Sequence, residues 1–471
     1  MVDKMSKSRS IQNNGHSTSW VGNFVLQGGP RYVQIADFIE RALSDGRLKP
    51  GDRLPPQRQL AALLKVDLTT VTRAYDEAKR RNLLEGHGAR GTYAAAPKVE
   101  LSHMLDLSMN IPPPPEAVDF DDLLKQGLAQ VLLRTDSDLL MAYHLGGGSK
   151  EARAAGAAWL TPMFKTVEPE HVVVCPGAQS ALAALILVLT QPGDVIVTEP
   201  AVYPGLCRAA EQLGRRVVAV QADDSGMDPD MLERTCREHD ARLIYLNPTL
   251  QNPTALTMPE QRRREIALIA ARCGAKIIED DPYWLLAEGA PRPVAHFAPQ
   301  QVYYVSTLSK CLTPGLRIAF VLLPEVQIRE RFLVALRSFA LMSTPLTTAL
   351  TTQWIYDGSA GRLLEGVRAE ARARQTLARQ ILAGSLQGPA DGIHIWLPLP
   401  SYWTPHELAR AARADGLAVA SSDAFFTGPQ PPNTIRISLG SIRDRARLAA
   451  ALRKLSQLLA RKPSMHRDLV I

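Results

Sequence analysis

Apolar residues recur with helical spacing near the start of the chain. Ile35, Ile39 and Leu43 are four positions apart, so we expect them on one face of a helix. A second helix is expected to start at Pro55-Pro56, because proline suits the first helical turn, and a third to run from about Leu68 to Arg81. The residues that these two helices are expected to bury are Leu60, Leu63, Leu64, Val71, Tyr75 and Ala78.

A glycine-rich turn follows the third predicted helix, which Asp67 is expected to cap. Residues 83–86 and 91–94 flank this turn, which carries Arg90, and they predict a β-hairpin. Three helices and a hairpin together predict a winged helix-turn-helix unit at residues 28–96.

Short apolar runs alternate with helical stretches in the rest of the chain. Strands that are apolar throughout and separated by helices are typical of a largely parallel sheet with both faces covered. We therefore predict an α/β domain over residues 104–471, a linker over 97–115 that contains Pro97 and Pro112–Pro115, and a polar tail at 1–27. The apolar runs are 172–174, 195–197, 242–246, 276–278 and 302–305.

Composition narrows the class of protein. The 471 residues are 46% hydrophobic and 21% charged, which is ordinary for a globular protein and excludes a disordered or disulfide-stapled chain. The longest apolar run, Ala181 to Leu189, is far shorter than the ~20 residues of a membrane span. The polar N-terminus has no apolar core for a signal peptide. The five scattered cysteines lack CxxC spacing, so we expect buried reduced thiols and a cytoplasmic protein.

The third predicted helix has a polar outer face in a basic unit. Residues 31–95 contain twelve Lys and Arg against eight Asp and Glu. Hydroxyls suit phosphate contacts and a guanidinium suits a guanine edge, so the candidate DNA contacts on this helix are Thr69, Thr70, Thr72 and Arg73. The charge alone also fits an ordinary solvated helical face.

Several segments of this unit resemble the GntR-type winged helix. They are Gly51–Pro55, Arg58, Leu60-Ala61, Thr69–Val71, Arg73–Tyr75 and Gly91–Tyr93. The resemblance implies double-stranded DNA as a partner, with roles for Arg53 and Arg58 on the DNA backbone, Thr70 and Arg73 on the recognition helix, and Arg90 and Gly91 in the wing. Asp67-Leu68 stands where many members of the family have Ser-Arg, so the resemblance implies no operator sequence.

One lysine is the centre of the candidate chemistry in the α/β domain. Lys310 follows the strand at 302–305, and Thr307, Ser309 and Arg317 offer hydroxyls and a guanidinium for a phosphate ester. An amine beside a phosphate site is what an aldehyde cofactor needs to form a Schiff base. By itself, a lysine after a strand also fits a surface residue.

Other segments of the domain add groups of the same kind. Pro176–Gln179 joins a strand to a helix, and its glycine lets backbone N–H groups approach a phosphate. Glu279–Asp281 ends a predicted parallel strand, where acids usually mark a ligand site, although a helix cap is the alternative. Tyr203 is suited to stack on an aromatic ring or to pack in the core. Asn252 lies in an Asn-Pro-Thr turn that can present an amide.

In this order, these motifs resemble a fold-type I aminotransferase from about residue 104 to the C-terminus. The resemblance implies pyridoxal 5′-phosphate (PLP) as cofactor, with Lys310 forming the internal aldimine and Asp280 pairing with the pyridine nitrogen. It implies that Tyr283 and Asn252 bind the ring hydroxyl and that Tyr203 stacks on the ring. The residues that the resemblance assigns to the phosphate are Gly177, Ala178, Gln179, Thr307, Ser309 and Arg317. It implies no metal ion.

Two further residues match substrate positions of that family. Arg436 matches the arginine that binds a substrate α-carboxylate, and Tyr143 matches a tyrosine that reaches the neighbouring subunit's site. Asn247 also begins an Asn-Pro-Thr sequence, but the 28-residue separation of Asn252 from Asp280 fits the family better. Asp280 is preferred over Asp281 because the family motif is Asp-x-x-Tyr.

A GntR-type winged helix followed by an aminotransferase-like domain resembles the MocR group of bacterial transcriptional regulators. The resemblance implies a domain-swapped homodimer and an amine, amino acid or PLP as effector, acting through the Schiff base at Lys310. The alternative is a catalytically competent aminotransferase of amino acids with an appended DNA-binding domain. A PLP-free scaffold is disfavoured because Lys310 and Asp280 are both present.

Overall fold

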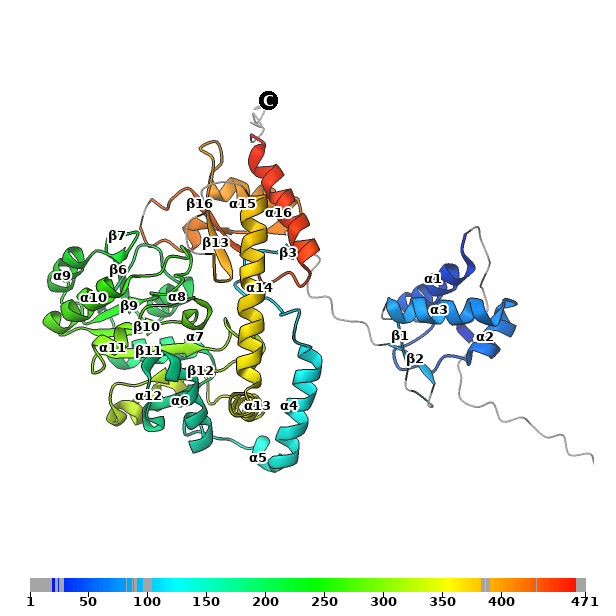
Figure 1. Ribbon diagram of the computed structural model, residues 1–471, viewed down its shortest axis with the longest axis horizontal. Helices are drawn as coiled ribbons and strands as arrows, with labels where there is room; N and C mark the ends of the chain where they lie inside the picture. The colour runs from blue at the N-terminus through cyan, green and yellow to red at the C-terminus, as the bar shows by residue number, and fades with distance from the viewer. Residues whose placement is uncertain are drawn as a thin grey trace, which may run out of the picture. The chain divides into compact units, whose positions relative to one another are not determined.

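The chain forms two compact units, Met1–His103 and Met104–Ile471 (Figure 1). The computed structural model describes residues 19–21, 24, 29–81, 83–86, 88, 91–95, 104–382, 386, 390–428 and 430–462. Residues 104–115, which we assigned from the sequence both to the linker and to the second domain, belong to the second unit. The remainder of the predicted linker, residues 97–103, lies outside the described residues.

The first unit is a three-helix unit with a hairpin, as the apolar spacing predicted. It contains α1 (Arg31–Ser44), α2 (Gln57–Leu64), α3 (Leu68–Arg80), β1 (Leu84–Gly86) and β2 (Thr92–Ala94), and the two strands pair antiparallel. Its hydrophobic core contains apolar residues from all three helices, and Leu84 and Ala94 of the hairpin pack into the same core.

Three details of the first unit differ from the sequence-based expectation. Leu63 is 47% exposed, because Leu60 and Leu64 take the inner face of α2 and each helical residue is rotated by about 100° from the next. Asp67 occupies the N-cap position of α3 but makes no side-chain cap hydrogen bond. In the tail predicted to be polar, Trp20 is buried, and its ring lies 5.7 Å from that of Phe38.

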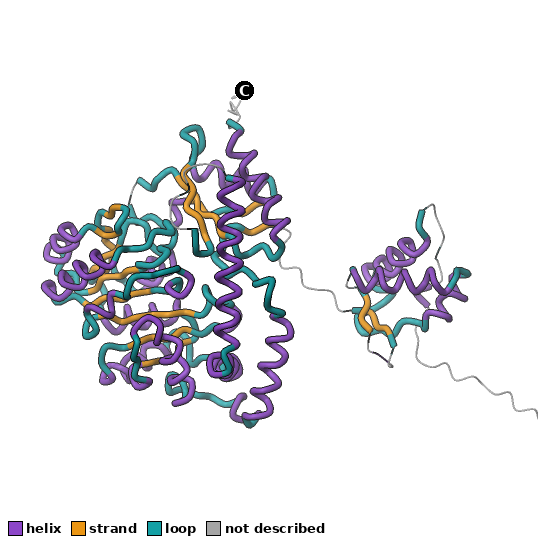
Figure 2. Tube along the Cα trace, viewed as in Figure 1, coloured by secondary structure: helices purple, strands orange, loops and turns teal. Residues whose placement is uncertain are grey.

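A seven-stranded sheet organises the second unit, in the order β4-β12-β11-β10-β9-β5-β6. Neighbours pair in parallel, except that β12 runs antiparallel to both β11 and β4. Helices cover both faces of the sheet (Figure 2). The strands are β4 (Val172–Cys175), β5 (Val195–Thr198), β6 (Arg216–Ala219), β9 (Leu243–Leu246), β10 (Lys276–Asp280), β11 (Val302–Thr307) and β12 (Ala319–Leu322).

Alternate residues of these strands enter two different hydrophobic clusters. Val172 and Val174 of β4 belong to one cluster, whereas Val173 and Cys175 belong to the other. Successive side chains of a strand point to opposite faces of a sheet, so a strand covered on both faces must be apolar throughout. The continuous apolar runs of the sequence have this origin.

A smaller layer follows the long helix α14 (Ser359–Ile381), which lies beside α13 and α16 (Figure 1). Its antiparallel sheet has the order β13-β16-β15, and β14 pairs in parallel with β3 from the start of the unit. These strands are β3 (Leu105–Asp106), β13 (His394–Pro398), β14 (Leu417–Ala418), β15 (Ala420–Ser421) and β16 (Thr434–Ser438).

The remaining elements complete the second unit. The hairpin is β7 (Ala222–Asp223) with β8 (Gly226–Met227). The helices are α4 (Phe120–Arg134), α5 (Ser137–Leu140), α6 (Lys150–Phe164), α7 (Ala178–Leu189), α8 (Pro204–Gln212), α9 (Pro229–Glu238), α10 (Glu260–Cys273), α11 (Val294–Phe297), α12 (Arg329–Arg337), α13 (Pro345–Tyr356), α15 (Pro405–Ala414) and α16 (Arg445–Ala460).

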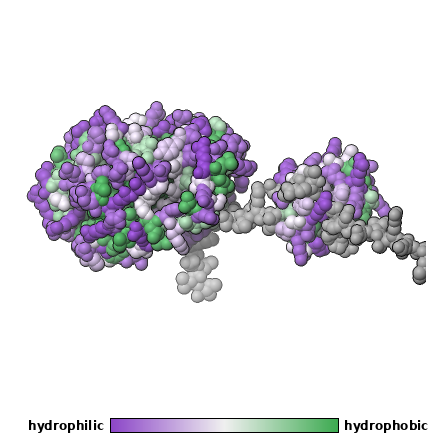
Figure 3. Space-filling view, turned by 90° about the horizontal axis from the view of Figure 1, so that it is seen from below, coloured by the Kyte–Doolittle hydropathy of each residue, from purple (hydrophilic) through white to green (hydrophobic). Residues whose placement is uncertain are grey.

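A largely polar surface and free cysteines are what the composition led us to expect. Polar residues cover most of the face shown in Figure 3, and apolar residues form separate patches on it. Among the described residues, no helix is both long and apolar enough to span a membrane. All five cysteines are free; three of them are buried, whereas Cys207 and Cys273 are half-buried.

Candidate functional site

Lys310 lies just beyond the carboxyl end of β11, next to the end of β10. The two strands are parallel and in register from Ile277–Val302 to Asp280–Val305, so their carboxyl ends meet at one edge of the sheet. The Nζ of Lys310 donates to the backbone oxygen of Asn110 at 2.7 Å. Burial, followed by repulsion from Arg436, lowers the pKa of Lys310 from 10.5 to about 8. The amine is therefore neutral, and nucleophilic, far more often than an exposed lysine at the same pH.

Asp280 ends β10 with one of its carboxylate oxygens unsatisfied. The hydroxyl of Tyr245 donates to Oδ2 at 2.8 Å, whereas Oδ1 is buried and has no hydrogen-bond partner within the described part of the chain. Burial raises the pKa of Asp280 to about 7, against the opposing effects of Tyr245 and Lys310. The carboxylate thus lacks one donor, and a cationic N–H group would stabilise its ionised form.

Tyr283 and Asn252 lie on two sides of the same site. The Nδ2 of Asn110 donates to the hydroxyl of Tyr283 at 3.1 Å. The Oδ1 of Asn252 accepts from Nη1 of Arg436 at 2.5 Å. Asn247, the rejected alternative, instead uses its Nδ2 to hold the backbone oxygen of Asp280 at 2.7 Å. The structure thus brings the side chain of Asn252, rather than that of Asn247, to Arg436.

Arg436 is buried in β16 with part of its hydrogen-bonding capacity unused. Its Nη2 donates to the backbone oxygen of Ser108, and its guanidinium lies 4.7 Å from the centroid of the Phe425 ring. Its Nε has no partner among the residues described. Burial lowers the pKa of Arg436 to about 10, so it remains a cation at neutral pH. A cation held in this way is suited to bind a carboxylate.

Arg317 lies against the N-terminus of α7, where we predict that a phosphate binds. Gly177 precedes α7 with φ +92°, and a Cβ built on it would lie 2.6 Å from Nη2 of Arg317. The Oγ atoms of Thr307 and Ser309 lie 3.2 Å apart. Backbone N–H groups at a helix N-terminus and a guanidinium are suited to bind an anion. The Arg317 guanidinium can lie this close to the start of α7 only because Gly177 has no side chain.

Tyr203 is linked to the start of α7. Its hydroxyl donates to Oε1 of Gln179 at 3.0 Å, and Nε2 of Gln179 donates to the backbone oxygen of Gly205 at 2.8 Å. These bonds tie the Tyr203 side chain to Gln179, the second residue of α7. Gln179 therefore orients Tyr203, a link that the sequence did not predict.

Four residues of the site had no signal in the sequence: Asn110, Ser108, Tyr245 and Phe425. Asn110 contacts both Lys310 and Tyr283, yet it lies 200 residues from Lys310. Tyr245 occurs in an apolar strand, where it is indistinguishable from a core residue. Only the tertiary fold brings these side chains to the site.

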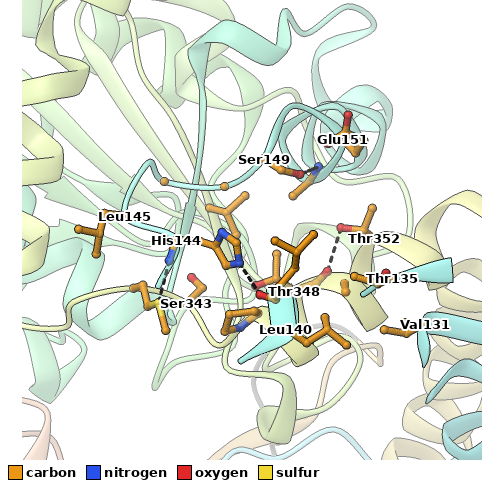
Figure 4. A pocket seen from close by; sticks show the side chains of 18 of the residues that line it. Val131, Thr135, Leu140, His144, Leu145, Ser149, Glu151, Ser343, Thr348 and Thr352 are labelled. Carbon is orange, nitrogen blue, oxygen red and sulfur yellow. Dashed lines mark hydrogen bonds between the residues drawn. The ribbon is translucent and has the colours of Figure 1, made fainter. Parts of the chain in front are cut away.

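Tyr143 lies away from these groups. It is 75% exposed and lies between α5 and α6, and the residue after it belongs to the lining of a cavity of about 430 Å³ (Figure 4). His144 lines the cavity, and its Nε2 lies 2.6 Å from the backbone oxygen of Leu139. Within the described part of one chain, Tyr143 is therefore not brought together with Lys310.

The predicted DNA-binding residues form an exposed surface on the first unit. Thr69 and Arg73 on α3 are exposed, as are Arg53 and Arg58. Thr70 is half-buried, and the hydroxyl of Thr72 donates to Oε1 of Gln57 at 2.9 Å, which ties α3 to α2. A Cβ on Gly91 would lie 3.0 Å from Nε of Arg53, so Arg53 lies against the wing. Arg90 lies outside the described residues.

The fold and the site together define an aminotransferase-like protein with an N-terminal winged helix. Residues 102–455 match the family "Aminotransferase class I and II", and residues 31–94 match "Bacterial regulatory proteins, gntR family". The chain belongs to the class I and II aminotransferase family and carries a gntR-family domain at its N-terminus, which agrees with the MocR-type organisation that the sequence resembles.

Curated relatives share both parts of the chain. The uncharacterized HTH-type transcriptional regulator YdeF of Bacillus subtilis (strain 168) is 29% identical over 94% of this chain and 97% of its own. The vitamin B6 salvage pathway transcriptional repressor PtsJ of Salmonella typhimurium is 28% identical over 87% of this chain and 94% of its own.

A solved aminotransferase shares the second unit. LysN, the alpha-aminoadipate aminotransferase of Thermus thermophilus, was solved with N-(5′-phosphopyridoxyl)-L-leucine. It has a TM-score of 0.69 and 26% identity, and the match covers 76% of this chain and 92% of that one. The second unit is therefore a fold-type I aminotransferase fold.

Pyridoxal 5′-phosphate is the cofactor that this family and fold imply, and the residues present fit it. The free Oδ1 of Asp280 suits a protonated pyridine nitrogen, and the Arg317 guanidinium beside the N-terminus of α7 suits a phosphate. When bound, PLP supplies an aldehyde that condenses with amines and a ring that withdraws electrons from them. Lys310 would hold the aldehyde end, and Arg317 would hold the phosphate.

Replacing Gly177 with alanine is expected to weaken PLP binding by about tenfold or more. The new Cβ would displace the Arg317 guanidinium, and alanine is strained at φ +92°. Titrating PLP into the apoprotein and following its absorbance measures the affinity. Gly361→Ala on α14 is the matched control, because no described heavy atom comes within 4 Å of its Cβ. Equal affinities in the two variants would contradict the phosphate assignment.

Proposed function

We propose that this protein is a PLP-dependent, DNA-binding transcriptional regulator that senses an amine, an amino acid or PLP through a Schiff base at Lys310. The observation that carries the proposal is the pairing of a gntR-family domain with a site in which Lys310, Asp280 and Arg436 converge. The curated relatives that share this organisation are named as transcriptional regulators. A protein of this kind acts in the cytoplasm, on double-stranded operator DNA.

Each residue of the site has its own role in binding the cofactor or the effector. Lys310 offers a largely desolvated amine with a lowered pKa, Asp280 holds a proton at the ring nitrogen, and Arg436 binds the carboxylate of an amino acid. Asn110 positions the lysine and Tyr283 through two hydrogen bonds. Binding of the effector changes the contacts of Arg436 with Asn252 and Ser108, because the carboxylate competes for the same guanidinium.

We also propose a homodimer in which Tyr143 reaches the partner's site. Leu139, Met141 and Tyr143 are exposed by 55%, 78% and 75%, an unusual amount of apolar surface in one short segment. Leu139 lines the cavity in Figure 4, which α13 also lines. A second copy packed on this face would cover these side chains. In the domain-swapped form, each winged helix would lie against the partner's second unit.

The rival function is a catalytically competent aminotransferase with an appended DNA-binding domain. What favours it is that all three residues are present, with Asp280 and Arg436 buried and Lys310 half-buried near them. A turnover assay with a panel of amino acids and a keto-acid acceptor, run beside an effector-dependent DNA-binding assay, separates the two functions. Turnover that continues over many cycles without any effect of amines on DNA binding would favour the enzyme.

Arg58→Ala is expected to lower the salt dependence of DNA binding. A protein that neutralises a phosphate releases its counterion, and each contact contributes a slope of about −0.9 to log K against log salt. Arg58 is exposed on α2 and is assigned to the DNA backbone, so its loss should reduce the slope by about one for every sequence. Fluorescence anisotropy with a labelled duplex at several salt concentrations measures the slope.

Arg73→Ala is the comparison for that measurement. Arg73 is exposed on α3 and is assigned to a base edge, so its loss should reduce the preference for the operator over random DNA. If Arg73→Ala weakened binding to all sequences equally, its assignment to base recognition would be wrong.

A further inference from the structure

A second cavity is lined in part by the loop of residues 247–256, which also carries Asn252. It has a volume of about 350 Å³, and its lining includes Glu199, Asp224, Gln251, Met258, Trp396 and Phe426. None of the described residues that we assigned to PLP or to the α-carboxylate lines it. The cavity is therefore separate from the space around Lys310.

Glu199 is a buried carboxylate in the wall of this cavity. It follows β5 directly and is only 9% exposed, and its Oε1 lies beside Gly226, where a built Cβ would approach it to 3.0 Å. The same loop continues to Tyr203, so the carboxyl end of β5 contributes one residue to each of two neighbouring sites. Ligands in parallel α/β sheets bind at this edge.

The charge of Glu199 is incompletely compensated. The backbone of Met227 and the side chain of Gln251 hydrogen-bond to it, and Arg262 attracts it, yet burial dominates and raises its pKa to about 7. Arg262 is committed to Asp223, with Nη2 to Oδ2 at 2.9 Å and Nη1 to Oδ1 at 3.1 Å. Asp224 adds a further negative charge to the lining. A buried carboxylate of this kind is stabilised by a cation.

The cavity is also bounded by apolar and aromatic residues. Trp396, Phe426, Leu256 and Met258 line it, and the Trp396 ring lies 6.2 Å from that of Phe425. Aromatic faces attract cations as well as apolar groups. A cavity that has both a carboxylate and aromatic residues in its lining is complementary to a ligand with a positive charge and an apolar body.

We propose that this cavity is a second ligand site, which binds an organic cation carrying an apolar or aromatic group, held by the Glu199 carboxylate and by the Trp396 and Phe426 rings. The site goes beyond the proposed function, because it binds its ligand without reaction at Lys310. Gln251 connects the two sites. It lines the cavity, its backbone oxygen lies 3.0 Å from Nε2 of His394, and the next residue, Asn252, accepts a hydrogen bond from Arg436. A ligand in the cavity therefore lies against the loop that positions Arg436.

The probe for this site is benzyltrimethylammonium, whose quaternary nitrogen cannot condense with an aldehyde. Calorimetric titration into the PLP-loaded full-length protein should give one site per chain and leave the cofactor spectrum without the change that a reacting amine causes. Glu199→Gln should weaken binding by about tenfold or more, because it removes the buried charge. Asp224→Asn, at a second acidic lining residue, should weaken it by about threefold.

Matched controls separate this site from the cofactor site. Glu238→Gln removes the same charge from the exposed end of α9 and should leave the affinity unchanged. Lys310→Ala should also bind the probe as tightly as the original protein, so a failure of the proposed Schiff-base switch would not affect this result. Benzyl alcohol, which has the ring but no charge, should bind at least about tenfold more weakly.

The pH dependence gives a test that needs no substitution. The probe is permanently charged, so only protein groups titrate, and those facing the carboxylate are Asp223, Asp224 and Arg262. Glu199 has a raised pKa, so it is largely protonated below about pH 7, and the probe should bind more tightly as pH rises from about 6 to 8. No binding at millimolar probe, equal affinity in Glu199→Gln, or a flat pH profile would overturn the proposal.

Discussion

Lys310→Ala is expected to abolish covalent attachment of PLP. In the original protein, borohydride reduction should fix the cofactor to the chain, and the modified peptide should contain Lys310. The variant should lose the visible absorption of the Schiff base, although PLP should still bind weakly, because Arg317 and the backbone beside Gly177 remain. Since the pKa of Lys310 is lowered to about 8, about one tenth of the amine is neutral at pH 7. Attachment should therefore become faster as pH rises from about 6 to 8.

The control for this prediction is Lys276→Ala. Lys276 lies on β10 and its Nζ donates to the backbone oxygen of Gln300 at 3.2 Å, so its loss should leave both PLP attachment and stability nearly unchanged. Operator binding should survive in Lys310→Ala, because the lysine belongs to the second unit, but the response to amines should be lost. An adduct on another lysine, or a full amine response in the variant, would contradict the switch proposed for Lys310.

The strands that the sequence predicted are those buried on both faces. The apolar runs at 172–174, 195–197, 242–246, 276–278 and 302–305 became β4, β5, β9, β10 and β11, each within two residues of the expected bounds. The strands that we did not predict differ physically. β6 lies at an edge of the sheet and begins with an exposed arginine, and β12 is inserted antiparallel between β4 and β11. No local sequence pattern indicates that a strand such as β12 lies antiparallel between two other strands.

The residues of the site also fall into two groups: those found in local sequence motifs, which we predicted, and those brought in from distant parts of the chain, which we did not. Lys310, Arg317, Asp280 and Gly177 occur in short motifs after strands, and parallel pairing brings those strand ends together. Asn110 comes instead from the region that we took for a linker, and it reaches Lys310 across 200 residues. It follows β3, which pairs with β14 and so joins the start of the unit to its small layer. Hydrophobic periodicity carries no information about such a contact.

Arg436→Lys is expected to separate recognition of the carboxylate from binding of the cofactor. The guanidinium is buried between Asn252, Ser108 and the Phe425 ring, and a carboxylate can accept two parallel hydrogen bonds from it. Lysine keeps the charge but offers a single point donor. Spectral titrations with amino acids should therefore weaken by about tenfold or more, at the upper range expected for loss of a charged hydrogen bond. The affinity for PLP should stay unchanged.

An amine without a carboxylate gives the internal control. Ethylamine condenses with the same aldehyde but makes no contact that requires the guanidinium, so its titration should be the same in Arg436→Lys and in the original protein. Arg447→Lys, an exposed change on α16, should alter neither titration. The contrast between amino acid and amine thus reports the carboxylate contact itself, since both ligands need Lys310. If amino-acid titrations were unchanged in Arg436→Lys, or if both ligands weakened equally, Arg436 would not be the residue that binds the carboxylate.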